Sequence, residues 1–251
     1  MFDDSKITII TATLNSEKFL PRLIKSLESQ TDKNFSWIIS DGGSSDRTLS
    51  IIKACINLNV LLLQKEDFGI YDALNNAISK IDSGYYLVLG ADDILFENSI
   101  RSYRDCLTSN TYDILTTAVI QNGKVIFPKS NLGWLFGLPG VSGHHAVGTL
   151  INIKLHKKFG FYSRKFPIAA DQLFLKTAIS NGADILRLTF VAGEFSTEGV
   201  SGTDHLGVIT ELFRVQVLTE KYHSIQYIIF LLRLSKLYIN SLAKFFHSLF
   251  R

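Results

Sequence analysis

Two adjacent carboxylates, Asp92 and Asp93, follow the apolar stretch YYLVLG at residues 85–90, with Ala91 between. The stretch is aromatic and aliphatic and ends in a glycine, which is typical of a buried strand. Two like charges at one strand end repel each other, so folding alone gives no reason to place them there. A hard divalent cation prefers oxygen ligands and leaves positions open for phosphate oxygens, so the pair predicts a metal and diphosphate site. The alternative is that Asp92 caps the next helix and Asp93 is solvated.

The first hundred residues alternate strands with helices. Strands are predicted at 6–14, 35–40, 59–64 and 85–90, since each is a short apolar run rich in branched or aromatic residues. Helices are predicted at 16–30, from the 41–46 loop through Cys55, and at 70–81, with Ser16 as the cap of the first. This order with short loops indicates an α/β fold with a doubly wound, mostly parallel sheet. Ligands of such sheets bind at the carboxyl ends of the strands.

Polar side chains follow the first two strands. Thr11, Thr13 and Asn15 stand at the end of the first strand, and Asp41 ends the second. The sequence contains neither G-x-G-x-x-G after the first strand nor G-x-x-x-x-G-K-[ST] anywhere, which argues against nicotinamide cofactors and P-loop chemistry. The two threonines could instead reflect β-propensity alone, and Asp41 could be a turn residue before Gly42.

The composition is that of a folded domain, with 251 residues of which 46% are apolar and four are proline. Cys55 and Cys106 lack metal-ligand spacing and fit core thiols in a reducing compartment.

The start Met1–Asp4 lacks the basic segment of a secretory signal, so a cytoplasmic location is expected. The formal charge is +3, and residues 221–251 hold five Lys or Arg and no acid, so the sequence disfavours a nucleic-acid-binding globule.

Four segments together resemble the nucleotide-sugar half of the inverting family 2 glycosyltransferases, which share the GT-A fold. They are ITIITATLNSEKFLPRLIKSLESQ, IISDGGSSDRT, KEDFGIYDALNNAI and YLVLGADD, and they cover most of residues 6–100 in order. The resemblance implies a nucleoside diphosphate sugar donor, most plausibly a UDP-sugar. It also implies divalent Mn or Mg and inversion at the anomeric carbon of a transferred hexose.

The resemblance assigns roles to individual residues. Asp41 would accept a hydrogen bond from the base, Asp92 would lie near the ribose and sugar, and Asp93 would bind the metal. The other residues expected to contact the nucleotide sugar are Thr11, Thr13, Asn15 and Asn75. Leu74 departs from the pattern, because many relatives have an arginine there that contacts base or phosphate. The GIYDALN form resembles a bacterial subgroup that builds surface polysaccharide.

The second half is less regular. The sequence predicts a hairpin at 112–127 that turns at Asn122-Gly123, a strand at 146–155, a helix at 169–182, a strand at 183–195, and helix from 205 onward. A polar loop at 196–204 has the character of a mobile lid.

Asp171 is the candidate base. The segment GHHAVGTLINIKLHKKFGFYSRKFPIAADQLFLKTA resembles the family's acceptor segment, and Asp171 falls where relatives keep the carboxylate that takes the acceptor's proton. Relatives often have Glu-Asp there, whereas this chain has Ala170 before Asp171. The alternative is an acid favoured by the dipole at a helix start.

Several polar residues have two interpretations. His144 and His145 could line the acceptor site or touch phosphate, or could be polar residues of a glycine-rich loop. Glu194, Glu198 and His205 flank the lid-like loop and could act there, with His205 reaching the metal or diphosphate, or could be solvated.

The tail is predicted to be an amphipathic helix. At 100° per residue, its polar stripe consists of Arg233, Lys236, Asn240, Lys244, His247 and Arg251. Its apolar arc consists of Leu231, Leu234, Tyr238, Leu242, Phe245, Phe246 and Leu249. A basic helix rich in Phe and Leu is typical of a membrane interface, and the apolar run 225–232 is too short to span a bilayer. The alternative is a helix packed on the catalytic domain or on a second subunit.

These features predict a GT-A domain at 1–204, with a nucleotide-sugar half at 6–100 and an acceptor half at 101–204. Residues 205–251 would form a membrane-associating helical extension. The predicted protein is a metal-dependent inverting glycosyltransferase on the cytoplasmic face of the membrane, which extends a lipid-linked oligosaccharide. The alternatives are a soluble transferase for a protein or small acceptor, and a nucleotide-sugar binding module without catalysis.

Overall fold

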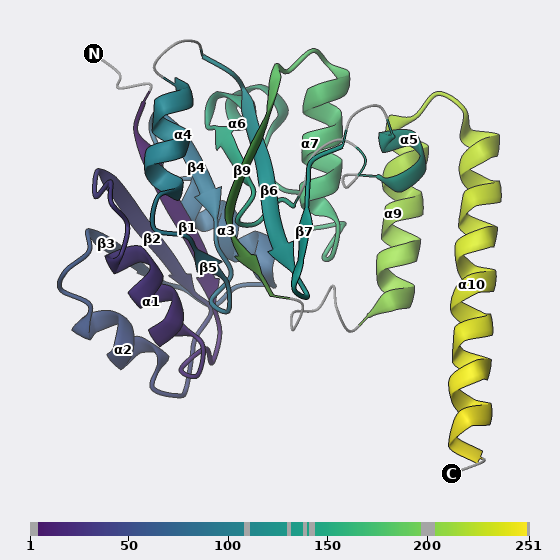
Figure 1. Cartoon of the computed structure of the whole chain (residues 1–251), viewed down its shortest axis with the longest axis horizontal. Helices are drawn as coiled ribbons and strands as arrows, with labels where there is room; N and C mark the ends of the chain where they lie inside the picture. Colours follow the sequence, from purple (N-terminus) through teal and green to yellow (C-terminus); the bar gives the residue numbers. More distant parts are fainter. Residues whose placement is uncertain are drawn as a thin grey trace.

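The computed structural model describes residues 5–107, 111–129, 132–137, 140, 144–196 and 204–249, with side chains described to Ala243. A single sheet runs through the molecule in the order β3-β2-β1-β4-β8-β6-β9-β5, and β7 pairs with β6 (Figure 1). Its strands are β1 Ile7–Thr13, β2 Phe35–Asp41, β3 Val60–Gln64, β4 Tyr85–Val88, β5 Ile94–Leu95, β6 Ile114–Gln121, β7 Lys124–Ile126, β8 Thr149–Asn152 and β9 Ile185–Phe195. The helices are α1 Leu20–Glu28, α2 Thr48–Ala54, α3 Ile70–Ile78, α4 Ser99–Leu107, α5 Gly133–Phe136, α6 Lys154–Phe159, α7 Ala170–Ser180, α9 His205–Thr219 and α10 His223–Leu249.

The first four strands form the predicted parallel half of the sheet. β1 lies between β2 and β4, and both pairings are parallel. The chain therefore leaves β1 toward one side for β2 and returns to the other side for β4. Ligands of open α/β sheets bind at such a reversal. The register sets Thr13 opposite Asp41, so the polar ends of β1 and β2 lie side by side.

The second half of the sheet is mixed. β8 runs antiparallel to both β4 and β6, while β9 is parallel to β6. The predicted hairpin is confirmed as β6 and β7, and its turn has φ of 50° at Asn122 and 71° at Gly123. A two-residue hairpin turn needs these left-handed angles so that its twist matches the right-handed twist of the two flanking strands. β5 pairs with the end of β9, which brings the chain just after Asp93 beside Glu194.

The core has two layers because successive strand residues point to opposite faces of the sheet. Ile9 packs with α1 and α4, in a cluster that includes Leu23 and Tyr103. Ile10 points to the other face and packs with α3 and α7, in a cluster that includes Leu74 and Phe174. The helices in Figure 1 cover both faces of the sheet accordingly. The near-continuous apolar strands of the first half follow from burial on both faces.

Two predictions about the elements are corrected, and the alternative interpretation of Asp92 as a helix cap is excluded. The first helix begins at Leu20 and not at 16, and Ser16 does not cap it, because its carbonyl accepts the amides of Phe19 and Leu20 in a preceding turn. Pro21 explains the late start, since its fixed φ suits the first turn of a helix. The strand predicted at 146–155 is shorter, because the chain enters α6 at Lys154. Asp92 caps no helix, because a short strand comes next and α4 starts at Ser99.

The C-terminal region consists of two helices. α9 packs on α7, and α10 packs on α9 and α5 at the edge of the molecule (Figure 1). The inward side of α10 includes Gln226, Ile229 and Arg233, and the Arg233 guanidinium donates to Oε1 of Gln216 and to the Leu135 carbonyl. The outward side exposes apolar side chains: Ile228, Leu231, Leu232, Tyr238, Ile239 and Leu242. Over the described residues, no helix combines the length and the apolar character needed to cross a bilayer.

Candidate active site

Asp41 organises the loop that follows β2. Its Oδ1 accepts the amides of Gly43 at 3.1 Å and Ser44 at 2.9 Å, and its Oδ2 accepts the hydroxyls of Thr13 at 2.9 Å and Ser44 at 2.6 Å. These four bonds use the four lone-pair sites of the carboxylate. A hydrogen bond from a base to Asp41 would therefore have to replace one of these partners.

Thr11 lies differently from the expected position at the nucleoside edge. It is fully buried, and its hydroxyl oxygen accepts the indole N–H of Trp37 at 3.0 Å. Trp37 is itself fully buried between the strands and α1. Thr11 therefore satisfies a buried donor, and its side chain does not reach the surface of the site.

Asn15 connects the ends of β1 and β2. Its side-chain Oδ1 accepts the backbone N–H of Ser45 at 2.9 Å, and its backbone N–H donates to Oγ of Ser44 at 2.8 Å. Its φ is 50°, in the left-handed region that asparagine tolerates better than most residues. Asn15 is exposed, so it stands at the accessible edge of the predicted nucleotide site.

The two acids after β4 have different surroundings. Asp93 is 2% exposed, its Oδ2 accepts the Gly90 amide at 2.7 Å, and its Oδ1 accepts the Ser196 amide at 2.9 Å. Burial raises the pKa of Asp93 to about 7, against the lowering effect of these two amides. Asp92 is half-buried and accepts no hydrogen bond from the described residues. A Cβ at Gly90 would lie 2.8 Å from Oδ1 of Asp92 and 3.1 Å from Oδ2 of Asp93, so a larger residue there would displace the two carboxylates from their present positions.

A bound cation would need ligands beyond this pair. Among the described residues, no group of three His, Cys, Asp or Glu side chains is arranged to hold a metal ion. Two adjacent carboxylates with one free side chain fit Mg²⁺ or Mn²⁺ chemistry, in which phosphate oxygens and water complete the coordination.

Asn75 also lies differently from expectation. Its side-chain amide donates to the Tyr162 carbonyl at 2.9 Å, and its Oδ1 accepts the Tyr162 amide at 3.0 Å. Both polar atoms of Asn75 therefore hold the backbone of the 160–169 segment. Leu74, where many relatives have arginine, is 2% exposed in the core and contributes no cation.

Asp171 begins α7 and meets side chains from two other segments. Tyr71 of α3 donates its hydroxyl to Oδ1 at 2.6 Å, and Nδ1 of His145 lies 3.7 Å from Oδ2. The Asp171 side chain is 16% exposed, so an acceptor hydroxyl can reach it. Burial, reinforced by the Asp171 charge, raises the pKa of Tyr71 well above its usual range, so the phenol stays a donor.

The start of α7 is held from α9. Glu211 is buried, and its Oε2 accepts the amides of Ile168 at 3.0 Å and Ala169 at 2.9 Å. These amides belong to the helix start, where backbone donors lack intrahelical partners. A residue of the C-terminal region thus sets the position of the helix that presents Asp171.

The remaining predicted residues are dispersed. His144 stacks on Phe195 with ring centroids 4.6 Å apart, and burial lowers its pKa while the Asp171 charge opposes this. Glu194 is exposed on β9. His205 is exposed at the start of α9, where it lines a groove against Lys236 of α10. Glu198 and most of the predicted lid lie outside the described residues.

Comparison with known sequences identifies the family. Residues 8–176 match the sequence profile described as Glycosyl transferase family 2, which is more than half of the chain. The chain belongs to this family. A PGL/p-HBAD biosynthesis glycosyltransferase of Mycobacterium tuberculosis is 36% identical over 93 residues. That alignment covers 36% of this chain and 36% of the relative, so it spans about a third of the length of that relative.

Two solved structures share the fold of this chain. Residues 1–349 of S. aureus TarS, solved with UDP-GlcNAc, superpose with a TM-score of 0.67 at 20% identity over 91% of this chain and 72% of that one. The mannosyltransferase PcManGT from Pyrobaculum calidifontis, solved with GDP-Man and Mn²⁺, gives 0.66 at 14% identity over 90% and 71%. The predicted GT-A architecture is thereby confirmed.

Some residues of this family 2 site escaped the sequence analysis. Tyr71 contacts Asp171, and Arg164 pairs with the buried Asp72 at the start of α3 through an Nε to Oδ1 distance of 3.0 Å. The sequence feature that could have indicated both contacts is the Tyr71-Asp72 pair, which places two polar groups at the start of an otherwise apolar helix. Tyr162 gave no signal, because an aromatic residue in an apolar segment is most simply a core residue.

Proposed function

We propose that this chain is an inverting glycosyltransferase that transfers a hexose from a UDP-sugar to a hydroxyl of a glycan acceptor. The observation that supports the proposal most directly is the partly exposed Asp171 carboxylate in a family 2 domain whose β4 ends in two further acids. Asp171 would take the proton of the acceptor hydroxyl while that oxygen attacks the anomeric carbon. The bond from that carbon to the diphosphate would break on the opposite face, and UDP would leave.

A divalent cation, Mn²⁺ or Mg²⁺, would neutralise the diphosphate as it leaves. Asp92 is the acid whose oxygens are free among the described residues, whereas Asp93 uses one oxygen for Gly90 and one for Ser196. We therefore propose that Asp92 reaches the cation. Asp93, to which the family resemblance assigns the metal, would then hold the loop and contribute at most a remaining lone pair.

The donor assignment can be tested by thermal shift. In the presence of Mn²⁺, UDP and a UDP-sugar should raise the melting temperature more than ADP or GDP at the same concentration, because the site is proposed to bind uridine more tightly. A ligand at 100 times its Kd stabilises the protein by about 2.7 kcal/mol. A stronger shift with GDP would transfer the proposal to a guanosine donor. No shift with any nucleotide would contradict it. Binding without transfer or slow hydrolysis of any UDP-sugar would favour the non-catalytic binding module.

We further propose that α10 places the enzyme on a membrane, where it would extend a lipid-linked oligosaccharide of a surface polysaccharide. α10 buries Ile229 and packs Phe230 against α9, yet still exposes a row of large apolar side chains, among them Ile228, Leu231 and Ile239. The polar residues Arg233 and Lys236 line the groove against α9. Packing on α9 and α5 accounts for the inward side of α10 and leaves the exposed apolar side chains without a partner among the described residues. An outward apolar face beside basic residues fits the interface of an anionic membrane. A soluble transferase for a protein or small acceptor is the alternative.

The membrane contact predicts that the double variant Leu231→Glu/Ile239→Glu loses vesicle binding. Both side chains are exposed on the outward face, and each buried apolar side chain contributes about 1.5–3 kcal/mol, so the loss should exceed tenfold. The control is Asn240→Glu/Ser241→Glu, which adds the same charge on the groove side and should retain most of the binding. Substitution is preferable to deletion, because Gln226 and Arg233 pack inward.

The measurement is co-sedimentation with anionic and neutral vesicles, with UDP–Mn binding as the check on folding. Binding should be stronger to anionic vesicles and weaker in high salt, because interfacial charges are screened within about 10 Å at 0.1 M. Wild-type protein that ignores vesicles would refute the contact. If the wild type is a dimer and the outward variant a monomer, the face is a subunit interface.

A further inference from the structure

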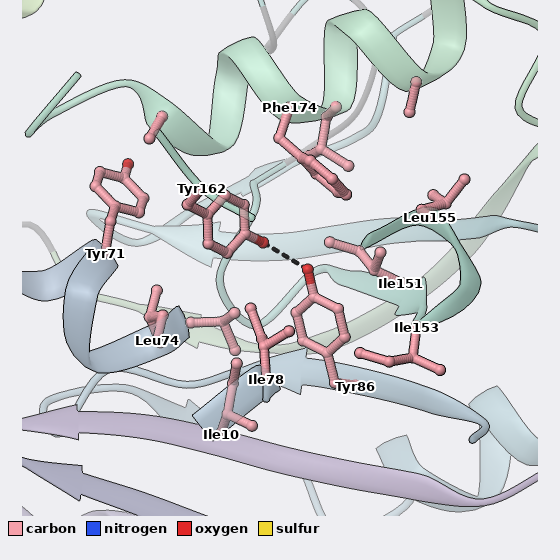
Figure 2. Close-up of a cluster of buried hydrophobic side chains, with 14 of the residues drawn as sticks. Ile10, Tyr71, Leu74, Ile78, Tyr86, Ile151, Ile153, Leu155, Tyr162 and Phe174 are labelled. Atoms are coloured by element: carbon pink, nitrogen blue, oxygen red, sulfur yellow. Dashed lines mark hydrogen bonds between the residues drawn. The ribbon is translucent and has the colours of Figure 1, made fainter. Parts of the chain in front are cut away.

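A chain of hydrogen bonds crosses the core between α6 and Asp171. Nδ1 of His156 lies 2.9 Å from the Gly160 carbonyl oxygen, and Nε2 of the same ring lies 2.8 Å from the Tyr86 hydroxyl. The Tyr86 hydroxyl lies 2.6 Å from that of Tyr162, which lies 2.7 Å from Nε2 of His145. Figure 2 shows the two tyrosines facing each other among apolar side chains, with their hydroxyls joined. The other nitrogen of His145 faces Asp171.

The direction of every bond in this chain follows from its first atom. A carbonyl oxygen only accepts, so His156 must carry its proton on Nδ1 and present a lone pair on Nε2. Burial lowers the pKa of His156 to about 4, so the ring is neutral near pH 7 and Nε2 is an acceptor. Tyr86 must then donate to His156, and its oxygen is left to accept from Tyr162.

The same logic fixes the tautomer of His145. Because the single proton of the Tyr162 hydroxyl is donated to Tyr86, its oxygen must accept from His145. His145 therefore carries its proton on Nε2, and Nδ1 presents a lone pair. That lone pair lies 3.7 Å from Oδ2 of Asp171, beyond the 2.7–3.2 Å of a hydrogen bond between nitrogen and oxygen. Two acceptors face each other, and the space between them lacks one proton.

We propose that His145 holds a proton together with Asp171, so that the pair rather than the carboxylate alone receives the proton of the acceptor hydroxyl. The inference rests on the proposed role of Asp171. The acceptor O–H bond breaks as its oxygen bonds to the anomeric carbon, and the proton passes to Oδ2 of Asp171. It is then shared with Nδ1 of His145 as a carboxylate–imidazolium pair, which draws the two atoms to hydrogen-bond distance. His145 acts through Asp171 and is a positioning residue.

The surroundings of His145 suit this role. The titratable groups beside it are Asp171 of α7, with Tyr71 of α3 on the other oxygen of that carboxylate, and Tyr162. The adjacent His144 also feels the Asp171 charge, and the chain continues from Tyr162 to Tyr86 of β4 and His156 of α6. Burial lowers the pKa of His145, and the charge of Asp171 opposes that effect. His145 is therefore neutral and presents the Nδ1 lone pair to Asp171. Asn75 clamps the backbone of Tyr162 on both sides, which keeps the acceptor of His145 in place.

The direct test is nitrogen NMR of the full-length protein with labelled histidine, since the two neutral tautomers have distinct ring ¹⁵N shifts. We expect His145 protonated on Nε2 and His156 protonated on Nδ1 at pH 7. Tyr162→Phe removes one oxygen and should shift His145 toward the Nδ1 tautomer, which can donate to Asp171. Tyr71→Phe is the matched control, because it removes the bond to the other oxygen of Asp171 and should leave the His145 tautomer unchanged. Asp171→Asn should lower the pKa of His145 further.

Kinetics give the functional readout. His145→Gln should lower kcat by about tenfold or more, a part of the 10²–10⁴ that a positioned base contributes, with the donor KM unchanged. The pH profile of kcat should also change, because no imidazole remains to share the proton with the carboxylate. His145 on the Nδ1 tautomer in the wild type, or the same pH profile in His145→Gln, would overturn the inference. Normal turnover in Asp171→Asn would refute the proposed base, and the NMR result would stand apart from that failure.

Discussion

Replacing Asp171 by asparagine should lower turnover by roughly 10²–10⁴-fold while leaving donor affinity nearly unchanged, since this is the usual scale for losing a general base. The substitution keeps the shape of the side chain and an acceptor for the Tyr71 hydroxyl at 2.6 Å, so α7 should keep its position. The start of α7 is also held by Glu211, which accepts the amides of Ile168 and Ala169 and is not affected by the substitution. The measurement is kcat and KM for donor on purified wild type and variant, with a UDP-release assay.

The control for this variant is Asp82→Asn, which makes the same chemical change at an exposed acid before β4. It should have wild-type kinetics. Turnover of Asp171→Asn within a few-fold of the wild type would place the base elsewhere. Glu194, exposed at the end of β9, would then be the next candidate base. Glu198, outside the described residues, would follow it.

Replacing Asp92 by asparagine should abolish the Mn²⁺-dependent part of UDP binding. A divalent cation contributes several kcal/mol to binding and stabilising a diphosphate, so we expect the affinity in Mn²⁺ to fall by about a hundredfold or more, to its value in chelator. Asp92 accepts no hydrogen bond from the described residues, so the melting temperature of the free protein should hardly change. Titration calorimetry of UDP with Mn²⁺ and with chelator measures the effect.

Asp93→Asn separates the two acids. It would turn an NH₂ group toward one of the two amides that Asp93 accepts, from Gly90 and Ser196, at a cost of about 1–3 kcal/mol in stability. The free protein should therefore melt earlier, and the remaining folded fraction should still show metal-dependent binding. If Asp93→Asn removes the metal effect and Asp92→Asn does not, the metal belongs to Asp93. Equal UDP binding with Mn²⁺ and with chelator in the wild type would refute a metal at either acid.

Much of the fold could be predicted from the sequence because its first half is locally determined. Each parallel strand is a short apolar run buried on both faces, and each helix between them has a regular apolar face. The hairpin turn was predictable because few residues other than Asn and Gly adopt the left-handed angles of its two positions. The predicted start of α1 was wrong because serine is a common helix cap, which favoured Ser16, whereas Pro21 decides where the helix begins.

The side-chain directions in the site could not be predicted. Thr11 and Asn75 belong to segments that match the family, yet the first turns to the indole of Trp37 and the second to the backbone of Tyr162. A single sequence reports which residues end a strand or form a helix face, and the tertiary partner decides what each polar atom meets. The chain from His156 to His145 joins residues of four separate segments, so no local pattern announces it. The orientation of α10 likewise depends on its contacts with α5 and α9.

Glu211 has a consequence for how the chain is made. Synthesis proceeds from the N-terminus, so the sheet and the residues of α7 leave the ribosome before residue 211 does. Until then the amides of Ile168 and Ala169 lack the carboxylate that they bind in the finished protein, and each such buried donor costs about 1–3 kcal/mol. The strands of the first half can thus pair while the first turn of α7 still lacks this support. Asp171, the proposed base, gains the full support of its helix start only after α9 has emerged from the ribosome.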